Sequence, residues 1–183
     1  MLPPITSIRK TALLLLLVTT LVSCNQGLTL QTYYVDNELK PGFTSVDVPT
    51  SFLNIDQTTL TEEEKKAYKS VDKLNMLAFV LSEDNKDEYD VELAKVKTIL
   101  KDPKYDEFMR GGSSEGKFAI KFIGEPDDID ELILFGNSND KGFAIVRVLG
   151  DDMNLNEIMK LGKALENANI DDSQVSDIMD FFK

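Results

Sequence analysis

Several short segments of the chain alternate between hydrophobic and polar residues. Successive side chains of a strand point to opposite faces of a sheet, so this period of two predicts half-buried strands. A first strand is predicted over 43–48, where Pro49 ends the alternation, and another over 117–123. In the latter, Phe118, Ile120 and Phe122 share one side and two lysines share the other. Further strands are predicted at 76–81, where the run is continuously apolar, and at 105–109, 129–135 and 143–149.

Other segments repeat their apolar residues every three or four positions, which predicts helices. Each has a polar start signal: Thr61 with Glu64, Asp90, and Asn154 with Glu157. The predicted helical stripes are Ala67, Val71 and Leu74; Leu93, Val96 and Leu100, followed by Pro103; and Leu155, Ile158, Gly162 and Leu165. Residues 137–142, between two predicted strands, are rich in turn formers and predict a hairpin loop.

The end of the chain carries one more apolar stripe, formed by Val175, Ile178, Met179 and Phe182. Their spacing predicts a final helix with a narrow hydrophobic face. Chain ends are usually disordered unless they dock. The stripe is therefore either packed on its own domain, which is the simpler interpretation, or it is the surface that a partner binds.

Strands grouped beside helices, rather than alternating strictly with them, predict an α+β fold with a mainly antiparallel sheet and helices packed against it. The length of 183 residues fits one domain. We divide the chain into a signal peptide over 1–23, a lipidated cysteine with a polar tether over 24–42, and a single domain over 43–183. The tether is predicted because 25–42 shows no clean period and ends in Pro41-Gly42.

The first 24 residues have the layout of a bacterial lipoprotein signal. Arg9 and Lys10 precede an apolar run from Thr11 to Val22, which is too short for a membrane-spanning helix of roughly 20 residues. The run ends in Leu21-Val22-Ser23-Cys24, which resembles a lipobox. The resemblance implies cleavage after Ser23 and lipid attachment to Cys24. The alternatives are an ordinary secretory signal and a short core helix.

Composition narrows the chemistry. The formal net charge is −12, and removal of residues 1–23 leaves 18 basic and 32 acidic residues, a net charge of −14. Such a charge repels phosphate backbones, so we expect no nucleic-acid partner. The chain contains no histidine, which excludes Ser–His–Asp and Cys–His catalysis and the usual zinc sites. Cys24 is the only cysteine, so no disulfide forms within one chain.

Two motifs resemble binding loops but lack essential residues. Residues 111–117 match the start of a P-loop, yet Phe118 stands where a hydroxyl should bind Mg²⁺, and the continuation alternates like a strand. We expect a glycine-rich hairpin and no nucleotide. Residues 137–142 resemble the start of a calcium loop, but Val148 replaces the bidentate glutamate. We therefore predict no cofactor and no metal site, with weak Ca²⁺ association of the acidic pairs left open.

Segments across the middle of the chain resemble the family known as domain of unknown function 4252. They are Gly42–Pro49, Tyr105–Arg110, Asp130–Phe135, Phe143–Gly150 and Asn154–Ile158. The resemblance implies a small envelope lipoprotein of Bacteroidota, with no assigned activity and no catalytic residues to carry over. It also implies a link with envelope signalling.

Two classes of function fit these features. The first is a non-catalytic envelope module that binds a protein partner or senses the state of the envelope. The alternative is a histidine-free, carboxylate-based hydrolase of envelope glycans. We expect the first, anchored in the outer membrane through lipid on Cys24. Asn rather than Asp at position 25 favours the outer membrane, and the absence of an acidic cluster after Cys24 favours its periplasmic face.

The lipobox generates a direct prediction. Replacing Cys24 with Ala removes the thiol that accepts the lipid, so the variant should incorporate no radiolabelled palmitate and should retain its signal peptide. The measurement is autoradiography of the protein captured from labelled cells, with Ser23→Ala as the control that keeps a small residue before the cysteine. Label retained in Cys24→Ala would exclude lipidation at this residue.

Overall fold

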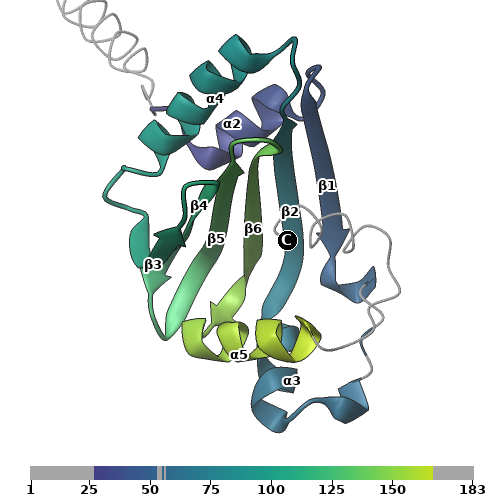
Figure 1. The fold of residues 1–183 in the computed structure, drawn as a ribbon. Helices are drawn as coiled ribbons and strands as arrows, with labels where there is room; N and C mark the ends of the chain where they lie inside the picture. Colours follow the sequence, from purple (N-terminus) through teal and green to yellow (C-terminus); the bar gives the residue numbers. More distant parts are fainter. Residues whose placement is uncertain (1–26, 53–54, 56, 167–183) are drawn as a thin grey trace, which may run out of the picture.

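A six-stranded antiparallel sheet forms the centre of the protein in a computed structural model, which describes residues 27–52, 55 and 57–166 (Figure 1). The strand order across the sheet is β1-β2-β6-β5-β4-β3. The strands are β1 (Phe43–Pro49), β2 (Val71–Val80), β3 (Asp106–Gly112), β4 (Gly116–Glu125), β5 (Asp128–Ser138) and β6 (Gly142–Met153). The sheet confirms the predicted α+β class, with β2, β6 and β5 paired along most of their lengths.

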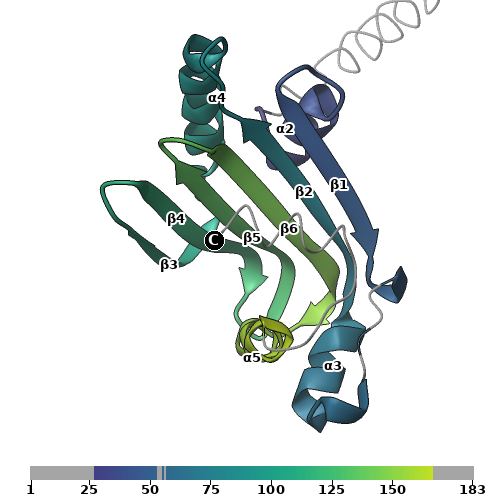
Figure 2. The same ribbon diagram turned by 45° about the vertical axis from the view of Figure 1, so that its right-hand side comes forward.

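Helices cover opposite ends of the two faces of this sheet (Figures 1 and 2). Helices α2 (Leu30–Asn37) and α4 (Lys86–Ile99) pack on the face that carries Phe79 and Phe143, here called the α2–α4 face. Helix α5 (Leu155–Glu166) crosses the lower end of the other face, the α5 face, and α3 (Glu62–Ser70) packs against it. Two short 3₁₀ turns, η1 (Thr50–Phe52) and η2 (Gln57–Thr59), follow β1.

Helix α2 lies inside the segment that was predicted to be a tether, so that prediction is wrong for residues 30–37. Thr29 caps the helix in a capping box with Thr32. Leu30, Tyr33, Tyr34 and Asn37 follow at helical spacing and are all buried. The hydrophobic pattern does not reveal this helix, because one buried position is the polar Asn37 and the hydrophobic Val35 is exposed.

Tyrosine hydroxyls tie α2 to its surroundings. Tyr33 donates to Glu92 of α4 at 2.7 Å, and Tyr34 donates to Asp47 of β1 at 2.8 Å. Burial, followed by the hydrogen bond to a carboxylate, raises the pKa of both phenols above the ordinary value. Both tyrosines therefore remain hydrogen-bond donors at neutral pH. The two tyrosines therefore pack on the domain.

The structure extends strand β2 further towards its start than predicted. Val71 and Leu74 were placed on a helical stripe with Ala67, but α3 ends at Ser70 and Val71 begins the strand. Leu74 also fits the period of a strand, because it shares a face with Met76. The earlier start of β2 adds residue pairs with both of its antiparallel neighbours, β1 and β6. Tertiary pairing overrides local helical spacing here. The capping box of Thr61 and Glu64 is confirmed.

Smaller differences concern where elements begin. Helix α4 starts after Asn85, and Asp90, predicted as its cap, lies within the helix. Gly162 faces solvent in α5, where Leu161 is buried instead. Asn154 begins α5 as predicted, since its side-chain oxygen accepts from the backbone of Asn156 and Glu157.

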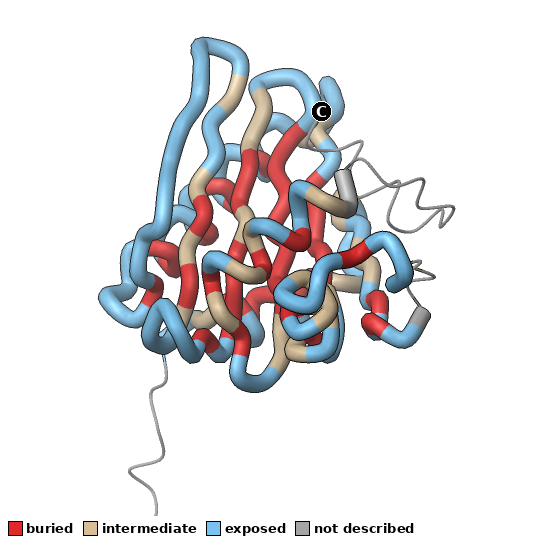
Figure 3. Tube along the Cα trace, turned by 90° about the horizontal axis from the view of Figure 1, so that it is seen from below, coloured by how far each residue is buried: buried red, intermediate tan, exposed pale blue. Residues whose placement is uncertain are grey.

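The core has two main clusters along the length of the sheet. Figure 3 shows that the buried residues concentrate on the strands of the sheet. Under α2 and α4, the rings of Phe43, Phe79 and Phe143 pack together with Tyr89, at centroid distances of 5.0–6.4 Å. Under α5, aliphatic residues of β5 and β6 meet Leu155, Ile158 and Leu161. Each end of the sheet therefore has its own core on its own face.

Gly142 begins β6 where the backbone leaves no room for a side chain. Its φ is +114°, and a Cβ there would overlap the carbonyl oxygen of Phe79. Gly142→Ala should therefore lower the free energy of unfolding by more than about 1 kcal/mol. Gly162→Ala is the matched control, because nothing lies within 4 Å of its Cβ position. It should stabilise by roughly 0.5–1 kcal/mol. Urea denaturation measures both, and equal effects would contradict this account.

Candidate functional site

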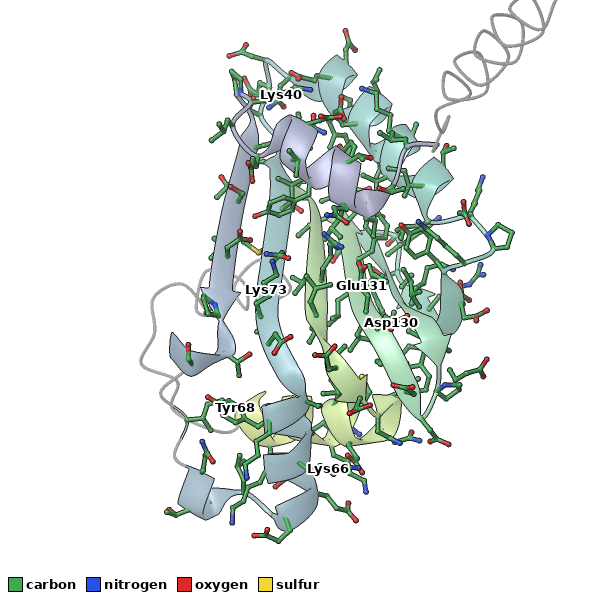
Figure 4. The ribbon with its side chains drawn as sticks, turned by 180° about the vertical axis from the view of Figure 1, so that it is seen from behind. Lys40, Lys66, Tyr68, Lys73, Asp130 and Glu131 are labelled. Carbon is green, nitrogen blue, oxygen red and sulfur yellow. The ribbon has the colours of Figure 1, made fainter. Side chains whose placement is uncertain are left out.

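Polar side chains cross the α2–α4 face where α2 and α4 leave it open. We call Asp47, Asn75, Arg147, Glu131 and Lys121 the polar band. Asp47 pairs with Asn75 across β1 and β2, and Asn75 pairs with Arg147 across β2 and β6. Figure 4 shows Glu131 on β5 and Lys73 on β2 in the part of the sheet below α2. The band thus runs from the edge strand β1 across β2, β6 and β5 to β4.

Arg147 and Glu131 form a buried ion pair at the centre of the band. Arg147 Nε donates to Glu131 Oε1 at 2.6 Å, and Nη2 donates to Oε2 at 3.0 Å. Each residue is only 8% exposed. Because both contacts are charge-assisted and parallel, they fix the plane of the guanidinium. Both oxygens of Glu131 are engaged, so this carboxylate is held as an acceptor.

The β1 side of the band is also internally bonded. Asp47 accepts hydrogen bonds from the hydroxyl of Tyr34 and from the side-chain amide of Asn75. Asn75 is 5% exposed, so its amide is held away from bulk water. These contacts bind α2 to β1 and β2 through polar groups as well as through the core.

A cavity of about 640 Å³ lies against α2 and reaches the ion pair. Its lining joins α2, the segment before β3, and the sheet. The lining residues are Thr29, Gln31, Thr32, Val35, Asp36, Lys104, Tyr105, Ile123, Glu131 and Arg147. This size lies in the range typical of small-molecule sites. Hydroxyl, amide, ammonium, guanidinium and carboxylate groups therefore border one concave space.

Tyr105 fixes the wall of the cavity opposite the strands. Its hydroxyl accepts from the backbone N–H of Leu30 at 3.3 Å, and its carbonyl accepts from Lys121 Nζ at 2.8 Å. The ammonium of Lys104 lies 4.9 Å from the centroid of the Tyr105 ring. One buried tyrosine thus connects the start of α2, strand β4 and the exposed lysine that borders the cavity.

The motifs that resemble binding loops lie elsewhere. Residues 111–117 form the end of β3, the turn at 113–115 and the start of β4, and Ser113 N donates to Gly116 O at 2.8 Å across the turn. This confirms the predicted hairpin. Asn139 N in the neighbouring β5–β6 hairpin donates to Glu115 O at 2.9 Å, so the two hairpin tips are in contact. No residue of either motif lines the cavity.

The residues that the sequence singled out fall outside the described part of the chain. Ser23 and Cys24 precede it, and Val175, Ile178, Met179 and Phe182 follow it. Within residues 27–52, 55 and 57–166, no three or more Cys, Asp or Glu residues form a group that could hold a metal ion.

The ion pair was missed, although the sequence contains a signal for it. Arg147 is the only charged residue between Phe143 and Leu149. The residues before and after it in this strand are buried on both faces of the sheet. A lone charge in such a run must find a partner in the interior. The predicted neighbouring strand over 129–135 contains two candidates of opposite sign, Asp130 and Glu131.

One family model matches the chain. It is described as Domain of unknown function (DUF4252), and it matches residues 34–161, more than two thirds of the sequence. The matched range covers every described strand of the sheet and every residue of the polar band. Comparison with curated proteins and with solved structures gives no match.

The buried ion pair predicts a distinctive stability pattern. Arg147→Met leaves a buried carboxylate without its partner and should lower the free energy of unfolding by about 3–5 kcal/mol. Glu131→Leu should also lower the free energy of unfolding, because it leaves a buried guanidinium without its partner. The double variant should lose less free energy of unfolding than the sum of the two single variants. Urea denaturation of the four proteins measures this cycle.

The control is the solvent-exposed pair of Lys65 and Glu62, where the ammonium lies 2.7 Å from the carboxylate. Lys65→Met should leave the urea midpoint unchanged, because exposed pairs contribute little. Strict additivity of Arg147→Met and Glu131→Leu would show that the two side chains do not depend on each other.

Proposed function

The chain belongs to the DUF4252 family, and we propose that it is a lipid-anchored cell-envelope protein that binds a polar partner in the cavity beside α2. The proposed anchor is lipid on Cys24, supported by the charged start, the short apolar run and the lipobox-like Leu21–Cys24. We place it on the periplasmic face of the outer membrane, a proposal that rests on Asn25 and on the residues that follow it. Across residues 27–52, 55 and 57–166, none of the helices has the length and apolar character to span a bilayer.

The observation that carries the binding role is the engaged state of Glu131. The cavity is bordered by two carboxylates, Asp36 and Glu131, which is the residue type that a glycan hydrolase would use. A general base or nucleophile needs a lone pair directed at the substrate, and a carboxylate whose charge is already neutralised by a fixed cation is a poorer base and nucleophile. Both oxygens of Glu131 instead accept from Arg147. This supports binding over hydrolysis.

The cavity also has the preorganisation that binding requires. Its floor is an ion pair on central strands, and its wall is held by Tyr105 through contacts with α2 and β4. Groups fixed before a ligand arrives lose little conformational entropy when it binds. The lining offers donors from Lys104 and the side-chain amide of Gln31 beside an acceptor from Asp36. A partner segment with both hydrogen-bond donors and acceptors matches this mixture better than a purely apolar one.

Site-specific photocrosslinking in the native envelope tests the proposal. A photoreactive residue at Gln31, an exposed position that borders the cavity, should capture a partner in living cells. The matched control is Gln57, an exposed glutamine in η2 that does not line the cavity. Lys104→Glu should reduce the Gln31 adduct several-fold, because it reverses a charge on the cavity wall without touching the core.

The readout is the intensity of adduct bands on gels, with mass spectrometry of each band. Equal labelling from Gln31 and Gln57, or no adduct from Gln31, would contradict a binding role for the cavity. Release of sugar from envelope glycans, abolished by Glu131→Gln at unchanged thermal stability, would establish the hydrolase instead.

A further inference from the structure

The α5 face carries an apolar row whose members come from strands alone. Val46, Met76, Val146 and Leu134 are paired across β1, β2, β6 and β5. Met76 and Val146 are each only 3% exposed, and the side chains that pack around them are Val46, Leu74 and Leu134. No helix among the described elements contributes a residue to this cluster. A row of this kind in the middle of a sheet requires a covering segment to keep it from water.

The next row, on the side of Met76 and Val146 that lies away from α5, is formed mainly by small residues. Ala78, Ala144 and Gly136 are paired across β2, β6 and β5, and Phe118 of β4 ends the row. Small side chains beside the larger Met76 and Val146 lower the surface locally, so that a covering segment can approach the sheet closely. Phe118 is 43% exposed and forms a hydrophobic rim on this side.

On this face, the row that α5 covers lies next to the row of Met76 and Val146, which no described helix covers. Val148 and Leu132 pack with Leu155, Ile158 and Leu161 of α5. Val146 and Leu134 lie two residues further along the same strands, a distance of roughly 7 Å. The apolar row therefore adjoins the part of the sheet that α5 covers.

The 17 residues after Glu166 contain a segment of matching character. Val175, Ile178, Met179 and Phe182 repeat at the spacing of one helical face, while Asp171, Asp172, Asp177 and Asp180 occupy other positions. Eight residues, 167–174, precede the stripe and span up to about 27 Å when extended. An eleven-residue helix over 173–183 would be about 16 Å long, enough to cross three strands that are about 4.8 Å apart.

We infer that residues 173–183 dock on the α5 face, with Val175, Ile178, Met179 and Phe182 against the row of Met76 and Val146. The apolar stripe covers the strand cluster, and the aspartates face water. This inference is independent of the proposed ligand cavity, which lies on the opposite face of the sheet. It also assigns the stripe to the chain's own domain rather than to a partner.

Disulfide trapping in the whole chain tests the contact. Cys24→Ser removes the only cysteine, and Met76→Cys then supplies one partner on the sheet. The second cysteine is placed in turn at Val175, Ile178, Met179 and Phe182, since a disulfide requires Cα atoms within about 7 Å. At least one of these pairs should form a bond within a single chain under mild oxidation, seen as a faster monomer band on a non-reducing gel.

Two matched pairs provide the controls. Asp177→Cys places the thiol on the opposite side of the predicted helix, and Lys73→Cys places it on the opposite face of β2. Asp177→Cys with Met76→Cys, and Lys73→Cys with Met179→Cys, should remain reduced. Failure of all four stripe positions would overturn the inference. Bonds that join two chains into a dimer would also overturn it, because they would make a second copy the occupant.

Thermal unfolding gives a second, independent measurement. Phe182→Asp in the otherwise unchanged protein should lower Tm by at least about 3 °C, because it places a charge in the docked stripe. Asp180→Asn, two residues away on the polar side, should leave Tm unchanged. An unchanged Tm for Phe182→Asp would overturn docking on the domain, whatever partner the segment then captured.

Discussion

The aromatic cluster on the α2–α4 face is the interaction on which the other parts of the structure depend. The rings of Phe79 and Phe143 stack with centroids 5.7 Å apart on the neighbouring strands β2 and β6. Phe43 of β1 meets Phe79 edge-on at 5.0 Å, and Tyr89 brings α4 to the same pair. Tyr33 of α2 reaches the cluster through Phe43 at 6.2 Å. Five elements are therefore positioned together, and one of them, α2, forms a wall of the cavity.

Because α2 and α4 pack at one end of one face and α5 packs at the other end of the other face, each face has a part that no described helix covers. These two parts differ in chemistry: one is polar and the other is apolar. Below α2, the open part of the α2–α4 face carries Arg147, Glu131 and Asn75, which are satisfied by one another and by their neighbours. Beyond α5, the other face carries Met76 and Val146, which have no polar groups to satisfy. A polar ligand would meet hydrogen-bonding groups at the first surface, whereas the second offers only apolar contacts. For this reason we assign a polar ligand to one surface and a segment of the same chain to the other.

Local patterns predicted most strands because each has one uniform face. In β4, Phe118, Ile120 and Phe122 share a side, and the alternation is visible without knowledge of the neighbours. Helix α2 was missed because its buried stripe contains Tyr33, Tyr34 and Asn37, and the hydroxyls of the two tyrosines are satisfied by partners distant in the sequence. The pairing of Arg147 with Glu131 was likewise hidden, since it depends on the register of β5 and β6. Register follows from tertiary structure, and no local period encodes it.

The presence of α2 also changes the geometry of the proposed anchor. A tether over 25–42 would allow the domain to stand up to roughly 60 Å from the lipid. The folded part instead begins at the cap Thr29, only five residues after Cys24, so the reach falls to about 18 Å. Thr29 itself lines the cavity. If Cys24 carries the lipid, the cavity therefore lies close to the bilayer surface, while the net charge of −14 on the mature chain opposes contact with anionic headgroups. With the proposed anchor, the short attachment and the like-charge repulsion would together keep the cavity near the membrane surface without burying it there.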